Sequence, residues 1–369
     1  MREFQYTTLA HRYTARFPTL TYVGTQVNFW ILVNILLAVI LHLNAGIIGY
    51  AVTPDVGNFR TTLLIAVVTG VLYGIGLGLP AYYLDRKFFK KVSLGKILVF
   101  KALISITLLA ILLTLFRFVL FDIWISPSLS VAGITLNEKS WNSLFHLLLI
   151  YYFFMSLVIG FINQVNKKYG PGVLLPLLLG RYRDPKEEER IFMFMDLKSS
   201  TSIAEQLGHL KYSSFIRDCF SDINEVLYPF YAQVYQYVGD EIVVTWPESE
   251  GIRNQACIRF YFAVKKQFQD RVAYYHSHYG TLPVFKAGLH MGKVTVVEIG
   301  EVKKDIAYHG DTLNTTARIQ RVCNEFNRDF LVSEHLIKKL QLDGNIQCEN
   351  LGSVLLKGKK EQIGIVSLA

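Results

Sequence analysis

The chain of 369 residues is long enough for two or three domains. Hydrophobic residues make up 51% of it and charged residues only 18%, which excludes an ordinary soluble protein. The four cysteines are widely spaced and form no CxxC pair, which argues against a disulfide framework or a zinc site and suits a reducing compartment. The net charge of +9 is compatible with nucleic-acid binding, but much of the basic excess flanks apolar runs, as in membrane proteins. We therefore expect no nucleic-acid partner.

The apolar residues gather in the first part of the chain. Residues 1–27 lack the features of a removable signal peptide and are expected to form a cytoplasmic N-terminal segment. Four apolar runs follow, at roughly 28–50, 61–83, 98–120 and 142–164, each near the ~20 residues with which a helix crosses a bilayer. Buried helices of a large soluble protein are the alternative, but these runs carry too few charges for it. We predict a domain of four transmembrane helices over residues 28–164, in contact with membrane lipid.

Basic residues indicate the orientation of these helices. They cluster between the second and third runs and after the fourth, whereas the first and third connections carry only Arg60 and Lys139. The positive-inside rule then places both termini and the C-terminal domain in the cytoplasm, with the chain in the cell (inner) membrane. The polar residues His42, Asn44 and Arg117 lie toward the outer ends of the runs, where snorkelling explains them, and a ligand-sensing role has no support.

Residues 165–187 are expected to form a connector. Gly170-Pro171-Gly172 interrupts any continuous helix, and the segment VLLPLLL that follows is short and apolar. This segment is compatible with a helix on the membrane surface, with pairing to its copy in a dimer, or with packing against the next domain.

Residues 188–369 have the pattern of a soluble α/β domain. A buried strand in RIFMFMDLKSST ends on Asp196, and helical spacing follows over 200–207 and 210–227. Residues 229–246 alternate like a hairpin with Gly239-Asp240 at its turn. Further expected elements are a helix over 252–279, two strands within 284–300 separated at residues 290–292, a helix over 314–327, a short strand over 330–332, and C-terminal strands around Gly352.

Two acidic residues stand where metal chemistry is feasible. Asp196 follows a buried strand and precedes a small polar turn, and Asp240 lies between two apolar strands. If the strands are neighbours, the two carboxylates can share a pair of divalent cations that polarise a phosphate. The alternatives are a helix-capping Asp and an ordinary Gly-Asp hairpin turn.

Basic and amide side chains follow later in the chain. Asn314 and Arg318 lie four residues apart, which puts them on one face of a helix. Lys357 and Lys359 flank Gly358, where a lysine can reach a polyphosphate, although these residues by themselves favour a basic surface turn.

Taken in this order, the residues resemble the catalytic domain of the class III nucleotidyl cyclases, the adenylate and guanylate cyclases. Four motifs agree in order over residues 188–369: FMFMDLKSST, YVGDE, AGLHMG with Gly300, and GDTLNTTARIQ, followed by LKGK. The resemblance implies an α+β, ferredoxin-like βαββαβ domain that works as a head-to-tail homodimer, with active sites at the interface and a nucleoside triphosphate as substrate.

The resemblance also implies roles for individual residues. It assigns two cations per site, Mg²⁺ or Mn²⁺, to Asp196 and Asp240 with the backbone of Leu197. It assigns ribose orientation to Asn314 and charge stabilisation on the α-phosphate to Arg318. The nucleotide-binding set that it implies consists of Leu197, Lys198, Ser199, Ser200, Thr201, Gln236, Ala307 and Lys359.

Three positions depart from the family pattern. Gln236 stands where many cyclases have Lys, and Ala307 where the partner is commonly Asp or Thr; these two positions normally read the purine edge. Val297 stands where the family often has Gly, which bears on packing. We expect a membrane-bound adenylate cyclase; the alternatives are a guanylate or other nucleotidyl cyclase, a catalytically inactive cyclase-like domain that binds nucleotide or a partner, and a transporter or channel with a cytoplasmic regulatory domain.

Overall fold

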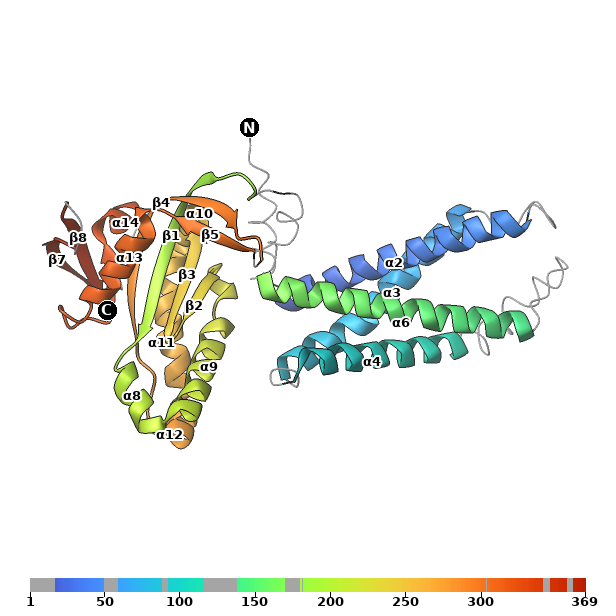
Figure 1. The fold of residues 1–369 in the computed structure, drawn as a ribbon, viewed down its shortest axis with the longest axis horizontal. Helices are drawn as coiled ribbons and strands as arrows, with labels where there is room; N and C mark the ends of the chain where they lie inside the picture. Colours follow the sequence, from blue (N-terminus) through green and yellow to red (C-terminus); the bar gives the residue numbers. More distant parts are fainter. Residues whose placement is uncertain are drawn as a thin grey trace. The chain divides into compact units, whose positions relative to one another are not determined.

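A computed structural model describes residues 17–49, 59–87, 92–115, 138–169, 180, 182–302, 304–340, 346–356 and 361–369 (Figure 1). The chain divides into two compact units, Phe17–Pro171 and one that contains Gly172–Ala369, and each is described by itself.

The first unit consists of four long helices. They are α2 (Pro18–Gly49), α3 (Phe59–Lys87), α4 (Leu94–Leu115) and α6 (Glu138–Tyr169). Each contains a stretch long and apolar enough to cross a membrane: Pro18–Asn44, Thr62–Leu84, Gly95–Thr114 and Asn142–Asn166. The predicted fold class is confirmed, with four long apolar helices before a mixed α+β domain.

The first helix begins before residue 28, where the first apolar run was expected to start. Its first residue is Pro18, whose fixed φ suits the first turn of a helix and whose missing N–H costs nothing there. The Thr21 N–H donates to the Phe17 carbonyl at 2.9 Å, which closes that turn. Residues 18–27 of the expected N-terminal segment are therefore part of helix α2. Arg117 lies outside the described residues.

Polar side chains within the helical unit hydrogen-bond across helices, which the sequence patterns did not indicate. Tyr152 donates to the Asn34 side-chain oxygen at 2.6 Å, and Thr69 donates to the same oxygen at 3.1 Å. A second chain of hydroxyls joins Tyr73, Ser105 and Ser156, and a pair of amides joins Gln26 to Asn163. In an apolar setting such bonds satisfy the polar groups and help to hold the helices together.

Glycines on α3 allow a close approach to α2. A Cβ at Gly70 would lie 2.6 Å from the Cα of Ile31, and one at Gly74 would lie 2.5 Å from the Cα of Val27. Both contacts are with backbone, which cannot move aside as a flexible side chain can. The spacing of four residues is the small-xxx-small pattern of closely packed membrane helices.

We expect Gly74→Val to separate α2 from α3 and to lower the thermal unfolding temperature of the full-length protein in detergent by several degrees. Gly24→Val is the matched control, because nothing lies within 4 Å of a Cβ at that position of α2. Equal unfolding temperatures for the two variants would contradict this packing.

The second unit is built on a mixed sheet of eight strands. They are β1 (Lys186–Leu197), β2 (Gln233–Val238), β3 (Glu241–Pro247), β4 (Phe285–Ile299), β5 (Asp305–His309), β6 (Phe330–Ser333), β7 (Cys348–Val354) and β8 (Ile363–Leu368). The order is β2-β3-β1-β4-β6-β8-β7, and β5 pairs with β4. Among these described pairings only β4 with β6 is parallel. The strand order places the buried β1 between β3 and β4.

Helices connect these strands. They are α8 (Ser200–Leu207), α9 (His209–Glu225), α10 (Glu248–Ile252), α11 (Ala256–Asp270), α12 (Val272–Tyr279), α13 (Asp311–Val322) and α14 (Glu334–Lys339), with short 3₁₀ turns at Tyr228–Phe230 and Arg253–Gln255. The single helix expected over 252–279 is wrong, because the chain breaks at Arg271 between α11 and α12. The helix expected over 314–327 starts earlier, after Gly310, and ends at Val322.

The division of residues 284–300 into two strands is also wrong, because β4 is continuous from Phe285 to Ile299. Gly292 pairs with Arg190 of β1 within the strand and makes no turn. Its lack of a side chain makes room for Thr312 of α13, whose Oγ1 would lie 2.7 Å from a Cβ at that position. The glycine therefore serves close helix packing.

The sheet has a different cover on each face. The odd-numbered residues of β1, such as Ile191 and Met193, join a core with side chains of α9, α11 and α12. The even-numbered residues point to the other face, where Phe192 packs with Tyr308 of β5 and Leu313 of α13. Asp196 belongs to this second series, because side chains alternate along a strand. The candidate site lies on the face that α13 and β5 share.

Candidate functional site

The strand pairing brings Asp196 and Asp240 together at one edge of the sheet. Asp196 is the next-to-last residue of β1 and pairs with Glu241, the first residue of β3. Asp240 directly precedes Glu241 in the turn from β2. The sequence patterns did not identify Glu241, because the register that places it beside Asp196 is not readable from a single strand.

The carboxylates at this edge disfavour one another's charge. Burial, and then the nearby charge of Asp240, raise the pKa of the half-buried Asp196 carboxyl. Burial and the charge of Asp196 raise the pKa of Glu241 to about 7. Carboxylates with raised pKa values are typical of functional sites, where a bound cation can offset the repulsion between them.

Two neighbouring side chains moderate this repulsion. The Gln320 amide of α13 donates to Asp196 Oδ2 at 3.4 Å, and Lys286 of β4 pairs with Asp196 on the opposite side from Glu241. Both contacts lower the pKa of Asp196, although burial outweighs them. Neither residue was among those predicted for the site.

The turn after Asp196 leads from β1 into α8. Leu197 is buried, and the Lys198 N–H donates to the Val284 carbonyl at 2.8 Å. Ser199 has φ 58°, a left-handed conformation that directs the chain into the helix beginning at Ser200. Thr201 is exposed in the first turn of that helix. The first N–H groups of a helix have no partner inside it, so this turn offers donors beside the carboxylates.

The Lys198 side chain contacts Asp329, the residue before β6, with its Nζ 3.4 Å from Asp329 Oδ1. Both side chains are more than a third exposed, so the pair is a weak surface contact that an anion can displace.

Asn314 and Arg318 lie on the outer side of α13, away from the carboxylates of the same chain. Asn314 is exposed and Arg318 half-buried, whereas Gln320, on the inner side of the helix, reaches Asp196. In the part of the chain that the structure describes, neither the Asn314 nor the Arg318 side chain has a hydrogen-bond or ion-pair partner. The structure thus brings Asp196 and Asp240 together but does not add Asn314 and Arg318 to that group within one chain.

The positions expected to read the base lie on two separate strands. Gln236 is exposed on β2, at a bulge between Val234 and Gln236. Ala307 is buried on β5 and pairs with Val297 of β4. Lys359, together with Lys357, lies outside the described residues.

The donor set at the sheet edge fits divalent cations. Carboxylate and carbonyl oxygens are the ligands that Mg²⁺ and Mn²⁺ prefer. Burial and, after it, the charge of Asp240 raise the pKa of Asp196, an effect that a bound cation would offset. Among the described residues no three His, Cys, Asp or Glu side chains are grouped in metal-binding geometry, so the fit rests on two carboxylates and backbone oxygen. Asp196, Asp240 and the Leu197 carbonyl are the groups available.

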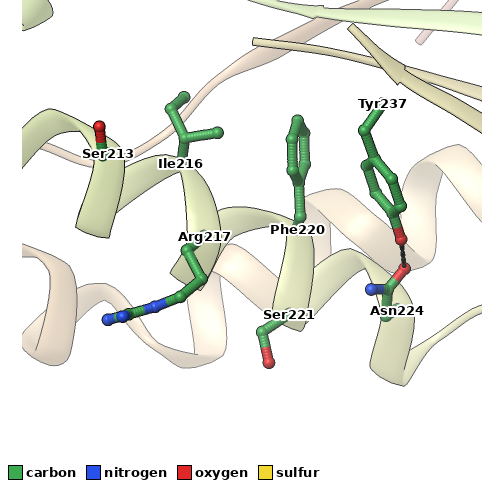
Figure 2. A pocket seen from close by; sticks show the side chains of 7 residues that line it. All are labelled: Ser213, Ile216, Arg217, Phe220, Ser221, Asn224 and Tyr237. Carbon is green, nitrogen blue, oxygen red and sulfur yellow. Dashed lines mark hydrogen bonds between the residues drawn. The ribbon is translucent and has the colours of Figure 1, made fainter. Parts of the chain in front are cut away.

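A shallow groove of about 510 Å³ lies elsewhere, between α9 and β2 (Figure 2). Figure 2 shows the Phe220 ring, which rises from α9, beside the Tyr237 ring, which comes down from β2 toward Asn224. The two ring centroids are 4.9 Å apart. The Tyr237 hydroxyl donates to Asn224 Oδ1 at 2.8 Å. Tyr237 is 48% exposed and Val238 54%, so the hairpin that carries Gln236 presents apolar surface.

Comparisons with known proteins agree with these features. Residues 184–366 match the family described as "Adenylate and Guanylate cyclase catalytic domain". The chain is 36% identical over 241 residues to "Adenylate cyclase 2" of Rhizobium meliloti (strain 1021), a match that covers 65% of this chain and 66% of the relative. It is 24% identical over 178 residues to "Adenylate cyclase" of Anabaena cylindrica, covering 47% of this chain and 35% of the relative. The chain therefore spans just under two thirds of the first relative and about a third of the second.

Among solved structures, a bacterial light-regulated adenylyl cyclase is similar to this chain with a TM-score of 0.50. The two are 21% identical, and the match covers 58% of this chain and 64% of the other. At that identity the likeness shows the fold.

Proposed function

Because residues 184–366 belong to the family of adenylate and guanylate cyclase catalytic domains, we propose that the chain is a membrane-bound adenylate cyclase. It converts ATP to 3′,5′-cyclic AMP and pyrophosphate at the interface of a homodimer. The observation that carries this proposal is the meeting of Asp196 and Asp240 at one sheet edge, beside the first turn of α8, whose N–H groups have no partner within the helix.

In this proposal the sheet edge holds the triphosphate. The carboxylates of Asp196 and Asp240, with the Leu197 carbonyl, would hold two divalent cations, Mg²⁺ or Mn²⁺. Such cations would lower the pKa of the ribose 3′-hydroxyl and neutralise charge on the phosphate oxygens. The N–H groups of residues 199–201 and the Lys198 side chain hold phosphate oxygens, and Lys359 contacts the β- and γ-phosphates.

Asn314 and Arg318 complete the site from a second copy of the chain. Asn314 orients the ribose, and Arg318 stabilises the charge that develops on the α-phosphate as the 3′-oxygen attacks and pyrophosphate leaves. Their place on the outer side of α13, without partners among the described residues, supports this division between chains. The exposed apolar side chains of Tyr237 and Val238 suit a surface that a second copy covers.

The proposed orientation places the catalytic domain in the cytoplasm, with the four apolar helices in the inner membrane. The basic loops between the second and third helices and after the fourth support it. Reporters fused after residue 90 and after residue 369 are expected to give cytoplasmic signals, and one fused near residue 130 an exterior signal. A cytoplasmic signal at residue 130 would contradict the four-span arrangement.

The base-reading positions predict the selectivity of the site. The Gln236 amide carries both a donor and an acceptor, so it can pair with either purine, whereas Ala307 offers no polar group. Discrimination between bases is strong chiefly where the wrong base leaves buried polar groups unpaired. We expect ATP to be preferred over GTP only modestly, and Mn²⁺ to support turnover at least as well as Mg²⁺.

Turnover of ATP, GTP, CTP and UTP by the purified full-length protein tests this selectivity. Strict selectivity for one purine would mean that a further base-reading group exists, and a preference for CTP or UTP would contradict ATP as the substrate.

A further inference from the structure

One buried arginine on the face of the sheet that carries the site has no place in the proposed mechanism. Arg190 lies in β1 and is only 5% exposed. It belongs to the same alternating series as Asp196, but at the other end of the strand, about 20 Å away at the usual rise per residue. It is therefore too far from the carboxylates to take part in the chemistry directly.

All three guanidinium nitrogens of Arg190 are hydrogen-bonded. Nη1 donates to Glu188 Oε2 of β1 at 3.0 Å, and Nε donates to Thr245 Oγ1 of β3 at 3.2 Å. Nη2 donates to Gln233 Oε1 of β2 at 2.9 Å. A planar guanidinium holds several partners in fixed directions, which a lysine ammonium cannot do.

The same guanidinium lies over the Tyr308 ring of β5. Its central carbon is 4.9 Å from the ring centroid of Tyr308, a cation–π contact in a desolvated setting. Tyr308 in turn packs against Tyr235 of β2, with ring centroids 4.9 Å apart, and its N–H donates to the Tyr235 hydroxyl at 3.4 Å. One side chain thus joins β1, β2, β3 and β5.

Two of these strands carry the positions proposed to read the base. Gln236 directly follows Tyr235 on β2, and Ala307 directly precedes Tyr308 on β5. Among the strands that the structure describes, β2 is at the edge of the sheet and β5 pairs with β4 alone, so no ladder hydrogen bonds fix the spacing between β2 and β5. The contacts through Arg190 and the two tyrosines link them directly.

We propose that Arg190 is a positioning residue that sets the spacing of β2 and β5 and thereby the shape of the base pocket. This proposal rests on the proposed cyclase function. It assigns to Arg190 an effect on nucleotide affinity and base selectivity, and little effect on the phosphoryl chemistry at Asp196. A displacement of reading groups by a fraction of an ångström is enough to weaken the hydrogen bonds on which base selectivity depends.

The test is the substitution Arg190→Lys in the full-length protein. Lysine keeps the charge beside Glu188 but cannot hold β2, β3 and β5 at once. We expect kcat/KM for ATP to fall by about three- to tenfold, the factor of one ordinary hydrogen bond, and the ratio of kcat/KM for ATP to that for GTP to fall towards one. KM for ATP should rise, and kcat at saturating ATP should change less than about twofold.

Arg271→Lys is the matched control. Arg271, between α11 and α12, also pairs with a carboxylate, that of the buried Asp222, and lies over a tyrosine, with its central carbon 4.2 Å from the Tyr274 ring centroid. It packs on the opposite face of the sheet, among the α9 and α12 side chains. Both variants should lower the unfolding temperature, but only Arg190→Lys should change the ratio of ATP to GTP use.

Gln233→Leu gives a second, milder test, which decides the matter if Arg190→Lys does not fold. It removes only the Nη2 contact and should shift the ratio in the same direction by a smaller factor. If the wild type is active but the ratio of ATP to GTP use is unchanged in these variants, the proposed role of Arg190 is contradicted and the proposed cyclase function is not. A wild-type protein that turns over no nucleoside triphosphate would contradict the proposed function itself.

Discussion

Replacing Asp196 with asparagine is expected to reduce cyclic AMP formation by about 1000-fold or more, without loss of folded protein. Asparagine has nearly the same shape but lacks the charge that holds a divalent cation, and the cations carry much of the catalysis in metal-assisted phosphoryl transfer. The measurement is kcat for the purified full-length variant at saturating ATP and Mn²⁺.

The stability of this variant separates chemistry from folding. Because burial raises the pKa of Asp196 in the folded protein, its ionised form is less favourable there than in the unfolded chain. At neutral pH that charge therefore lowers stability, and Asp196→Asn should unfold at the same temperature as wild type or higher.

Glu334→Gln is the control for Asp196→Asn. Glu334 pairs with Lys338 on the surface of α14, a contact worth little. We expect Glu334→Gln to keep full activity under the conditions in which Asp196→Asn loses it. Near-normal turnover by Asp196→Asn would contradict a metal-binding role for this carboxylate.

Arg318→Ala should lower kcat by about 100- to 1000-fold, because the charge developing on the α-phosphate loses its partner. The same loss is expected whether the arginine acts within its own chain or across the dimer. A mixing experiment decides between the two.

Co-expressed Asp196→Ala and Arg318→Ala chains should regain activity that neither has alone. In a heterodimer one site then combines an intact carboxylate pair with an intact arginine. Random pairing gives about half heterodimers with one of two sites intact, so about a quarter of wild-type activity is expected. Pull-down with two different affinity tags confirms that the chains mix. No recovery in mixed dimers would show that each site is contained within one chain.

Local patterns in the sequence predict the element types well. The apolar runs of the first half correspond to four helices, and the hairpin turn at Gly239-Asp240 is confirmed between β2 and β3. The strand that ends near Asp196 and the turn into a helix after it are also as the sequence indicates.

Features that depend on strand register or on helix packing could not be predicted. Glu241 lies beside Asp196 only because β1 and β3 pair in one particular register. Gly292 resembled a turn signal, but it makes room for Thr312 of a helix that follows later in the chain. Register and close packing are tertiary properties, and the residues of one strand do not show which strand it pairs with or in which register.

Polar contacts between segments that lie far apart in the sequence could not be predicted either, for the same reason. Arg190 resembled one more charge at the end of a charged connector, yet it is buried among four strands. Asn34 and Tyr152 each resembled an isolated polar residue in an apolar run, and they are hydrogen-bonded to each other. Burial of such groups is favourable only when a partner is present, and the partner lies far away in sequence.

Formation of cyclic AMP and pyrophosphate from ATP by the purified full-length protein is the most direct test of the proposed function. With Mn²⁺ present, the two products are expected in equal amounts, to depend on the cation, and to disappear with Asp196→Asn. ATP hydrolysis to ADP and phosphate, or ATP binding without any product, would contradict it.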